Sequence, residues 1–394
     1  MQSVTWIKKL DHIIYGLLIL LAASSCISDA FCRNLVRVLI PLSIVRIALQ
    51  PQLLMRLQPY GTMLKAFICF FAMLLVEALY GGHFFSVLQE GRIVYMYNIL
   101  LLFLMPILIK NELQIRNLFY LLLVSLACMD LHIFWQAYHG VPRPVSSAWS
   151  VPATTAMFYM VLTPFLGVML IYKKKISYVI LLIATITALL LTQTRGAWLA
   201  ILPVGLYLLV YYMRNIKKIL LAVVLGASFI AIFMSFSHGL QEHVRSIGNP
   251  QTFSVAERFK MWRSAEQMFA DHPLMGVGLG NYAEAYQKVY ILPEAREPWI
   301  FHAHNNFIHF FAEDGLFGGV IFLGLNLYLL YWGWKRRSNF YGMIFFSSTL
   351  ALALFSFTDY AFAQFVGMRL YYFCGGLCLA GAEQQSVREN IFLD

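Results

Sequence analysis

The sequence predicts an all-α integral membrane protein with about twelve transmembrane helices and one large, partly helical periplasmic loop. Of its 394 residues, 60% are hydrophobic and 12% are charged. Soluble domains carry about 25% charged residues, so this chain needs a solvent other than water. Apolar stretches of about 20 residues recur along the chain, and each can cross a hydrocarbon core of roughly 30 Å as a helix. The short alternating segments of an outer-membrane barrel do not dominate.

The apolar stretches predict the helices in chain order. Lys8 and Lys9 precede the first stretch, which resembles a signal peptide without a clear cleavage site and is expected to remain as the first helix. The expected helices cover residues 11–29, 33–50, 63–80, 92–109, 116–135, 153–172, 176–193, 196–213, 216–236, 316–334, 340–358 and 361–381. They divide the chain into residues 1–236 with nine helices, the loop 237–315, and residues 316–394 with three helices and a tail.

The basic residues predict the orientation of these helices. They gather at alternate junctions between the apolar stretches, and the positive-inside rule assigns those junctions to the cytoplasm. These residues are Lys8, Lys9, Arg56, Lys65, Lys110, Arg116, Lys173, Lys174, Lys175, Arg214, Lys217, Lys218, Lys335, Arg336, Arg337 and Arg388. Both termini are therefore expected in the cytoplasm, with Arg195 and the loop 237–315 on the opposite side. The short outer loops hold little basic charge beyond Arg33, Arg92 and Arg143.

The formal net charge of +10 does not indicate a nucleic-acid partner. The chain has no basic tract interleaved with aromatics and no nucleic-acid motif. Its six cysteines are interpreted as small buried hydrophobes, with a Cys26–Cys32 disulfide as the alternative.

An arginine stands at a predicted membrane edge within residues 192–198, whose sequence is TQTRGAW. Arg195 is costly there unless it pairs, snorkels or meets an anion. Gly196 allows another backbone or a ligand to approach closely. The structural alternative is a snorkelling arginine beside an interfacial Trp198.

The long loop contains a second unusual arginine, on a predicted helix from about 254 to 270. Ser254-x-x-Glu257 has the form of a capping box. One apolar stripe joins Val255, Phe259, Trp262, Ala265 and Phe269. Arg258 falls inside this stripe, which suggests an anionic partner; the alternatives are an ion pair with Glu266 and a lipid headgroup.

The glycine-rich run 276–281 is predicted to be a tight turn. It lacks the G-K-[ST] and the preceding strand of a phosphate-binding loop.

Three histidines stand where the loop meets a membrane helix: His302, His304 and His309. Histidine exchanges protons near neutral pH, which suits acid–base chemistry. A metal site is the competing interpretation, since H-x-H can chelate and His302 and His309 lie two turns apart on a helix. No cysteine or H-E-x-x-H accompanies them, and structural histidines are the third alternative.

At these residues the sequence resembles the O-antigen ligase family, which is related to the O-antigen polymerases. The family hallmark is His followed by Asn, Ser or Gln, then nine residues, Gly, two residues and a small or Tyr residue. Here it reads His304-Asn305, Gly315 and Gly318. The T-R-G-x-W element of residues 194–198 and the run from Arg258 to Gly278 follow the family in the same order.

The resemblance implies a glycosyltransferase that moves O-antigen polysaccharide from undecaprenyl diphosphate to a sugar hydroxyl of the lipid A–core. It implies a site on the periplasmic face of the inner membrane and an inverting displacement that needs no metal, cofactor or nucleotide sugar. Arg195 and Arg258 are expected to bind the donor diphosphate, because guanidinium offers bidentate contacts to phosphate oxygens. His304 is expected to be the general base or a donor to the phosphate, and the two roles stay open.

Five further residues are secondary candidates: His302, Asn305, Arg143, Arg263 and Arg369. Arg369 lies within the last predicted helix, where its alternative is a structural pair with Asp359 or another bundle residue. Two other functions remain open, an O-antigen polymerase and a transporter of lipid-linked sugars.

Overall fold

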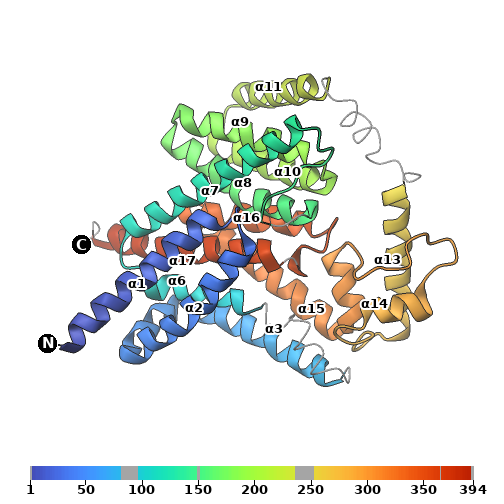
Figure 1. Cartoon of the computed structure of the whole chain (residues 1–394), viewed down its shortest axis with the longest axis horizontal. Coiled ribbons are helices and arrows are strands. Elements are labelled where there is room, and N and C mark those ends of the chain that lie inside the picture. The colour runs from blue at the N-terminus through green and yellow to red at the C-terminus, as the bar shows by residue number, and fades with distance from the viewer. Residues whose placement is uncertain (1, 81–95, 149–150, 236–252, 364, 392–394) are drawn as a thin grey trace.

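The computed structural model describes residues 2–80, 96–148, 151–235, 253–363 and 365–391, and over these ranges it contains helices and no strand. The all-α class is therefore confirmed (Figure 1). The α-helices are α1 (Gln2–Ser24), α2 (Asp29–Leu49), α3 (Gly61–Tyr80), α6 (Leu100–Leu108), α7 (Glu112–Tyr138), α8 (Pro152–Lys173), α9 (Ile176–Leu191), α10 (Arg195–Met213), α11 (Ile216–Ser235), α13 (Phe253–Asp271), α14 (Tyr282–Ala285), α15 (Asn306–Lys335), α16 (Phe340–Phe355) and α17 (Phe365–Ile391). Short 3-10 or π segments are η1 (Pro51–Tyr60), η2 (Met96–Ile99), η3 (Tyr286–Tyr290) and η4 (Ala361–Ala363).

A helix stands at the position of every predicted span. The predicted helix 92–109 is described only from residue 96, so Arg92 lies outside the described residues, as does the part of the predicted loop before residue 253. The main difference is α15, which begins at Asn306 rather than at 316. Gly315 breaks it with φ 63° and ψ −160°, so a short helix that contains His309, Glu313 and Asp314 precedes the long apolar one.

Seven helical segments of the described chain are long and apolar enough to cross a membrane: Pro51–Leu79, Glu112–Tyr138, Pro152–Lys173, Arg195–Met213, Ile216–Phe233, Asn306–Lys335 and Phe365–Gln385. Three shorter apolar helices accompany them, at Tyr97–Leu108, Ile176–Leu191 and Phe340–Phe355. The chain is thus a polytopic membrane protein by length and composition of its helices, while the expected count of about twelve crossings is not confirmed.

The helices form one bundle around α16 and α17. In Figure 1, α1, α2, α3 and α6 lie on one side of these two helices and α7 to α10 on the other. Most side chains of α8 and α16 are buried, because other helices surround them. By contrast, α11 packs on α10 at the edge of the bundle and exposes apolar side chains, as expected of a helix that contacts lipid. Cys26 and Cys32 are free thiols, so the alternative of a disulfide is wrong.

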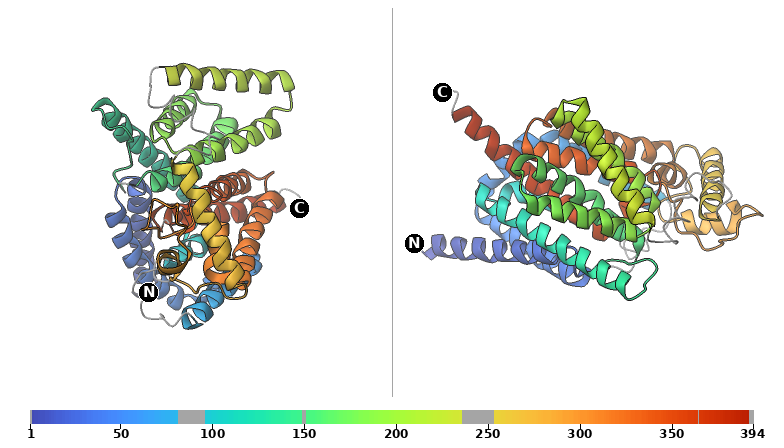
Figure 2. Two further views of the ribbon diagram at one scale, coloured as in Figure 1. Left: turned by 90° about the vertical axis from the view of Figure 1, so that its right-hand side faces the viewer. Right: turned by 90° about the horizontal axis from the view of Figure 1, so that it is seen from above.

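Helices α13 and α14 and segment η3 form a lobe at the end of the bundle opposite both termini (Figures 1 and 2). The lobe has its own core, which includes Met261, Ala265, Met268, Tyr282 and Tyr286. The predicted apolar stripe of α13 is therefore only partly correct. Phe259, which belongs to that stripe, is 48% exposed, because α13 packs into the lobe core through Met261, Ala265 and Met268 instead.

Candidate functional site

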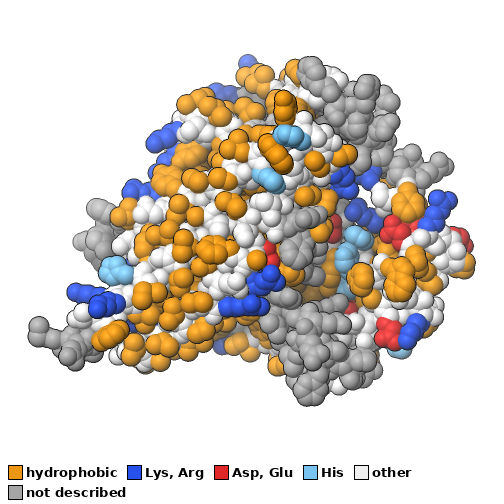
Figure 3. Space-filling view, viewed as in Figure 1, with side chains coloured by type: hydrophobic (Ala, Val, Ile, Leu, Met, Phe, Trp, Pro, Cys, Tyr) orange, Lys and Arg blue, Asp and Glu red, His pale blue; other side chains and the backbone are white. Residues whose placement is uncertain are grey.

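The candidate site lies where the lobe meets the bundle. Four segments contribute to it: the start of α10, the first turns of α13, residues 302–306 at the start of α15, and residues 356–360 between α16 and α17. Figure 3 shows Lys, Arg and His side chains gathered between the lobe and the bundle. The sequence predicted three of these segments and did not single out the fourth.

His304 faces a carboxylate across this junction. Its Nδ1 lies 3.6 Å from Oδ1 of Asp359, and the His304 side chain is 32% exposed whereas that of Asp359 is 8% exposed. His304 has φ +50°, a left-handed conformation that costs a non-glycine residue about 1–2 kcal/mol. Backbone strain of this kind persists only where the surroundings impose it, and it concentrates at functional sites. The backbone N–H of His304 donates to Nδ1 of His302 at 3.3 Å.

Two asparagines tie the segment before α15 to the segment that carries Asp359. Asn305 caps α15, since its Oδ1 accepts from the N–H of Ile308, and its Nδ2 donates to the carbonyl of Phe357 at 3.1 Å. Asn306 donates through its backbone N–H to the Ser356 carbonyl at 2.9 Å and through Nδ2 to the Ser356 hydroxyl at 3.0 Å. Asn305 is thus a structural cap here, and the two asparagines fix the spacing between His304 and Asp359.

Asp359 is held as a carboxylate by its neighbours. Burial alone would raise the pKa of this group, but the contact with His304 and the positive charges of His302 and Arg258 lower the pKa below its usual value. The backbone N–H of Tyr360 also donates to Oδ1 of Asp359 at 2.7 Å. The charge of Asp359 therefore faces Nδ1 of His304.

Arg143, Arg195 and Arg258 form an arginine cluster beside this pair. Burial and the charge of Arg258 lower the pKa of Arg143, and the charges of both act on Arg195. Within the described residues, neither Arg143 nor Arg258 forms an ion pair with a carboxylate. The Glu266 alternative for Arg258 is therefore wrong. Gathered guanidinium groups repel one another, so their arrangement favours an anionic ligand.

Hydrogen bonds connect the elements that carry the cluster. Nη2 of Arg195 donates to the hydroxyl of Ser254 on α13, and Nε of Arg143 donates to the carbonyl of Thr192 at 3.4 Å. The predicted capping box of Ser254 and Glu257 does not form. Glu257 instead binds Lys260 at 2.8 Å and accepts from the N–H of Arg296.

Gly196 lets α10 approach the segment with Asp359. A Cβ at this position would lie 2.1 Å from Oγ1 of Thr358 and 2.9 Å from its Cβ, both far inside van der Waals contact. The expected close approach at Gly196 is therefore observed. It places Arg195 and Asp359 on neighbouring elements although they are far apart in sequence.

A backbone crossing at two glycines positions the start of α15. Gly276 and Gly315 both have φ +63°, and a Cβ on either would lie within 2.4 Å of backbone atoms of the other segment. The N–H of Leu316 donates to the Pro273 carbonyl and the N–H of Gly278 donates to the Glu313 carbonyl. The glycine run is thus a turn, as predicted, and it satisfies the polar groups that the break in α15 leaves free.

His309 belongs to this supporting structure rather than to the open site. Its Nε2 lies 3.1 Å from Oε2 of Glu313, and both side chains are buried. Oε1 of Glu313 accepts the N–H of Gly280 at 3.1 Å. Among the described residues, no group of three His, Cys, Asp or Glu side chains has the arrangement of a metal site.

Two secondary candidates lie elsewhere. Arg369 is buried and pairs with Asp29 at 2.9 Å, and its Nε donates to Asn98. The structural alternative for Arg369, a pair with a bundle residue, is therefore confirmed, with Asp29 and not Asp359 as the partner. This pair joins α17 to α2. Arg263 is exposed on α13 and makes no ion pair in the part of the chain that the structure describes.

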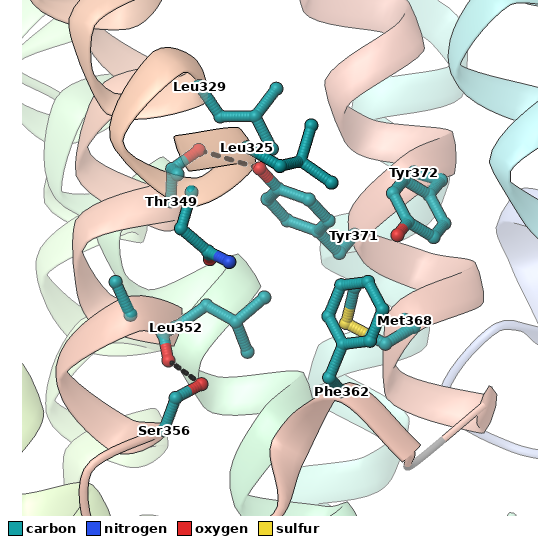
Figure 4. Close-up of a pocket in the computed structure, with 11 residues that line it drawn as sticks. Leu325, Leu329, Thr349, Leu352, Ser356, Phe362, Met368, Tyr371 and Tyr372 are labelled. Carbon is teal, nitrogen blue, oxygen red and sulfur yellow. Dashed lines mark hydrogen bonds between the residues drawn. The ribbon is translucent and has the colours of Figure 1, made fainter. Parts of the chain in front are cut away.

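A small internal cavity lies beneath the site, between α15, α16 and α17 (Figure 4). Leu325, Leu329 and Leu352 give it apolar walls, and Ser356 and Phe362 close its outer end. Ser356 is the residue to which Asn306 is bonded. The cavity is therefore part of the support below the site and not the place where arginine and histidine side chains meet.

A family model described as O-antigen ligase matches residues 179–323, from within α9 to within α15. The match includes Arg195, Arg258 and His304 and confirms the family resemblance; Arg143 and Asp359 lie outside it. It points to an enzyme of the O-antigen ligase or polymerase type. No curated protein matches the chain.

Proposed function

We propose, from the O-antigen ligase family domain that the chain carries over residues 179–323, that it transfers O-antigen polysaccharide from undecaprenyl diphosphate to a sugar hydroxyl of the lipid A–core. The observation that supports this most is the position of the His304–Asp359 pair beside the arginine cluster. One part suits a sugar hydroxyl and the other suits a diphosphate.

The arginine cluster is assigned to the leaving group. Breaking the bond between the anomeric carbon and the diphosphate leaves additional negative charge on the phosphate oxygens. Arg195, Arg258 and Arg143 offer cations that are already gathered before the charge develops, which is the arrangement that stabilises a transition state. Helices α10 and α15 both begin at the site, so their N-terminal dipoles add to this positive field.

His304 is assigned to the acceptor. Nδ1 faces Asp359, which leaves Nε2 for the hydroxyl of the acceptor sugar. In the proposed step this nitrogen takes the hydroxyl proton, the oxygen attacks the anomeric carbon, and the bond to the diphosphate breaks. Asp359 stabilises the imidazolium that results. A single displacement inverts the configuration at the anomeric carbon. Arginine cations neutralise the leaving group in this scheme, so no metal or other cofactor is required.

Both proposed substrates are anchored in lipid, which explains why an enzyme that transfers sugars would have a large membrane bundle. The N-termini of α8 and α15 lie towards the site, and these helices end at Lys173 and Lys335. Basic residues at the ends away from the site support a cytoplasmic placement of those ends and a periplasmic placement of the lobe. We propose that the protein lies in the cell inner membrane.

The proposal is tested with purified protein in detergent, an undecaprenyl-diphosphate-linked donor and a lipid A–core acceptor. A new glycosidic bond, still formed in the presence of EDTA, is the expected result. A transporter would form no bond, and loss of activity in EDTA would contradict the absence of a metal.

The lipopolysaccharide of a deletion strain separates the two family activities. Loss of a ligase leaves core without O-antigen and accumulates the lipid-linked polymer. Single repeat units attached to the core would instead identify a polymerase and contradict the proposal.

A further inference from the structure

Two aromatic side chains are exposed in the lobe directly before the proposed base. Trp299 is 73% exposed and Phe301 is 67% exposed, whereas Ile300 between them is 5% exposed. A fully extended chain spans at most about 3.6 Å per residue, so the Cα atoms of Phe301 and Trp299 lie within about 11 Å and 18 Å of that of His304. The two rings thus stand on the same segment as the proposed catalytic side chain.

This exposure does not arise from a loosely attached segment. Ile300 and Ala303 belong to the core of the lobe. Nε1 of Trp262 donates to the Ala303 carbonyl at 2.8 Å, and the carboxylate of Glu257 accepts the N–H of Arg296 at 3.0 Å. The backbone is therefore anchored on both sides of the two rings, and they remain exposed although each could gain about 1.5–3 kcal/mol by burial.

The charges of the segment that carries the two rings indicate what covers them. Segments that bind anionic lipid surfaces are rich in Lys and Arg, but residues 291–301 contain Glu294, Glu297 and one basic residue, Arg296. The diphosphate is likewise assigned to the arginine cluster. An uncharged ligand with an apolar face and hydroxyl groups fits both the rings and the carboxylates, and the C–H face of a sugar ring has these properties. Aromatic faces carry negative charge density and attract such hydrogens.

Building on the proposed function, we propose that Trp299 and Phe301 form a saccharide subsite that stacks on an uncharged sugar ring next to the bond being made. The sugar belongs either to the acceptor core or to the donor polysaccharide, and the chemistry of recognition is the same for both. The subsite orients the saccharide, while His304 and the arginine cluster carry the reaction.

Binding is measured first, because it requires no turnover. The full chain in detergent is titrated separately with lipid-free core oligosaccharide and with lipid-free O-antigen polysaccharide, and the tryptophan emission is followed. We expect one of the two to change the emission, which identifies the source of the sugar. Trp299→Ala should abolish the change and Trp299→Tyr should keep the affinity in a competition assay. Trp6→Ala is the matched control, because Trp6 is 69% exposed and lies near the start of α1, and the N-terminal end of the chain lies opposite the lobe.

Kinetics then test the role of the subsite. Trp299→Ala is expected to raise KM for the substrate that contains this sugar by about tenfold, and Phe301→Ala by about threefold, with kcat nearly unchanged, as fits the loss of one stacked ring. Equal KM values in wild type and Trp299→Ala would overturn the subsite while leaving the proposed function intact. Saccharide binding without any bond formation would instead overturn the proposed function alone.

A lipid-binding role is the remaining outcome. If phosphatidylglycerol vesicles change the emission of Trp299 and neither saccharide does, the two rings contact the membrane and the subsite is refuted.

Discussion

Nδ1 of His304 lies 3.6 Å from Oδ1 of Asp359, and the two residues reach this position from opposite sides of α15 and α16 in the sequence. The imidazole of this pair is partly exposed and stands on a residue with a left-handed backbone, whereas the carboxylate is buried. In the proposed reaction the imidazole becomes positively charged, so removal of the carboxylate should affect the transition state more than substrate binding.

Asp359→Asn is expected to lower kcat by about 100-fold or more, as is typical when general base catalysis is lost, and to change KM little. Initial rates with the lipid-linked donor and the lipid A–core acceptor measure this. Asp271→Asn, on the lobe, is the control for loss of a carboxylate. A normal kcat in Asp359→Asn would remove this residue from the mechanism.

The same carboxylate predicts a pH dependence of stability. Because the pKa of Asp359 is lowered in the folded protein, its stabilising effect is complete above the usual Asp pKa of about 3.9 and is lost as the pH falls below it. Thermal unfolding in detergent should therefore show wild type more stable than Asp359→Asn at pH 7, with the difference shrinking below about pH 4. A difference that grows at acid pH would contradict this sign.

Arg258→Ala is expected to raise KM for the donor by about 10- to 100-fold, since a hydrogen bond to a charged group contributes about 1.5–3 kcal/mol. Arg263→Ala is the matched control, because Arg263 lies on the same helix and is exposed. Equal effects of the two substitutions would show that general charge, and not a site, binds the donor.

Gly315→Ala is expected to lower stability by about 2–5 kcal/mol, through its left-handed conformation and a clash with the backbone of Leu274. Gly324→Ala, in the same helix, meets nothing within 4 Å and should leave stability unchanged or slightly raised. The two melting temperatures in detergent give the comparison. Similar values would show that the crossing at Gly315 tolerates a side chain.

Arg369→Ala is expected to reduce the yield of folded protein, because an uncompensated Asp29 in a buried pair costs about 3–5 kcal/mol. Protein that survives purification should retain normal KM values, as Arg369 is far from the substrates in this scheme. A raised KM with normal stability would return Arg369 to the list of binding residues.

Much of the bundle could be predicted from the sequence, because a membrane span imposes both length and apolar composition on a helix. The sequence predicts a helix that starts just after Gly315, but it does not predict the helical turns before this residue. Residues 306–314 are too few, and too interrupted by His309, Glu313 and Asp314, to be predicted as a membrane span. They are helical because Asn305 caps them and the backbone of the glycine turn bonds to their end. The apolar face of α13 is predicted less well, because this face packs against Tyr282 and Tyr286, which lie outside α13 in the sequence.

The site was predicted in part. Arg195, Arg258 and His304 carry unusual local signals, namely a charge at a membrane edge, a charge on an apolar face and a cluster of histidines. Asp359 carries no such signal, because one acidic residue after a membrane helix is ordinary. It could be assigned to His304 only once Asn306 and Ser356 were seen to join their segments. The sequence also leaves Asp359 open as a partner of Arg369, but the bundle residue that pairs with Arg369 is Asp29.

The close approach of Gly196 to Thr358 has a consequence for how the protein can be divided. Thr358 lies outside residues 179–323, so part of the packing around the matched region comes from the chain near the last two helices. If the chain were cut after the matched region, neither half would contain the whole site. The two halves, expressed separately, would have to reassociate before activity returned.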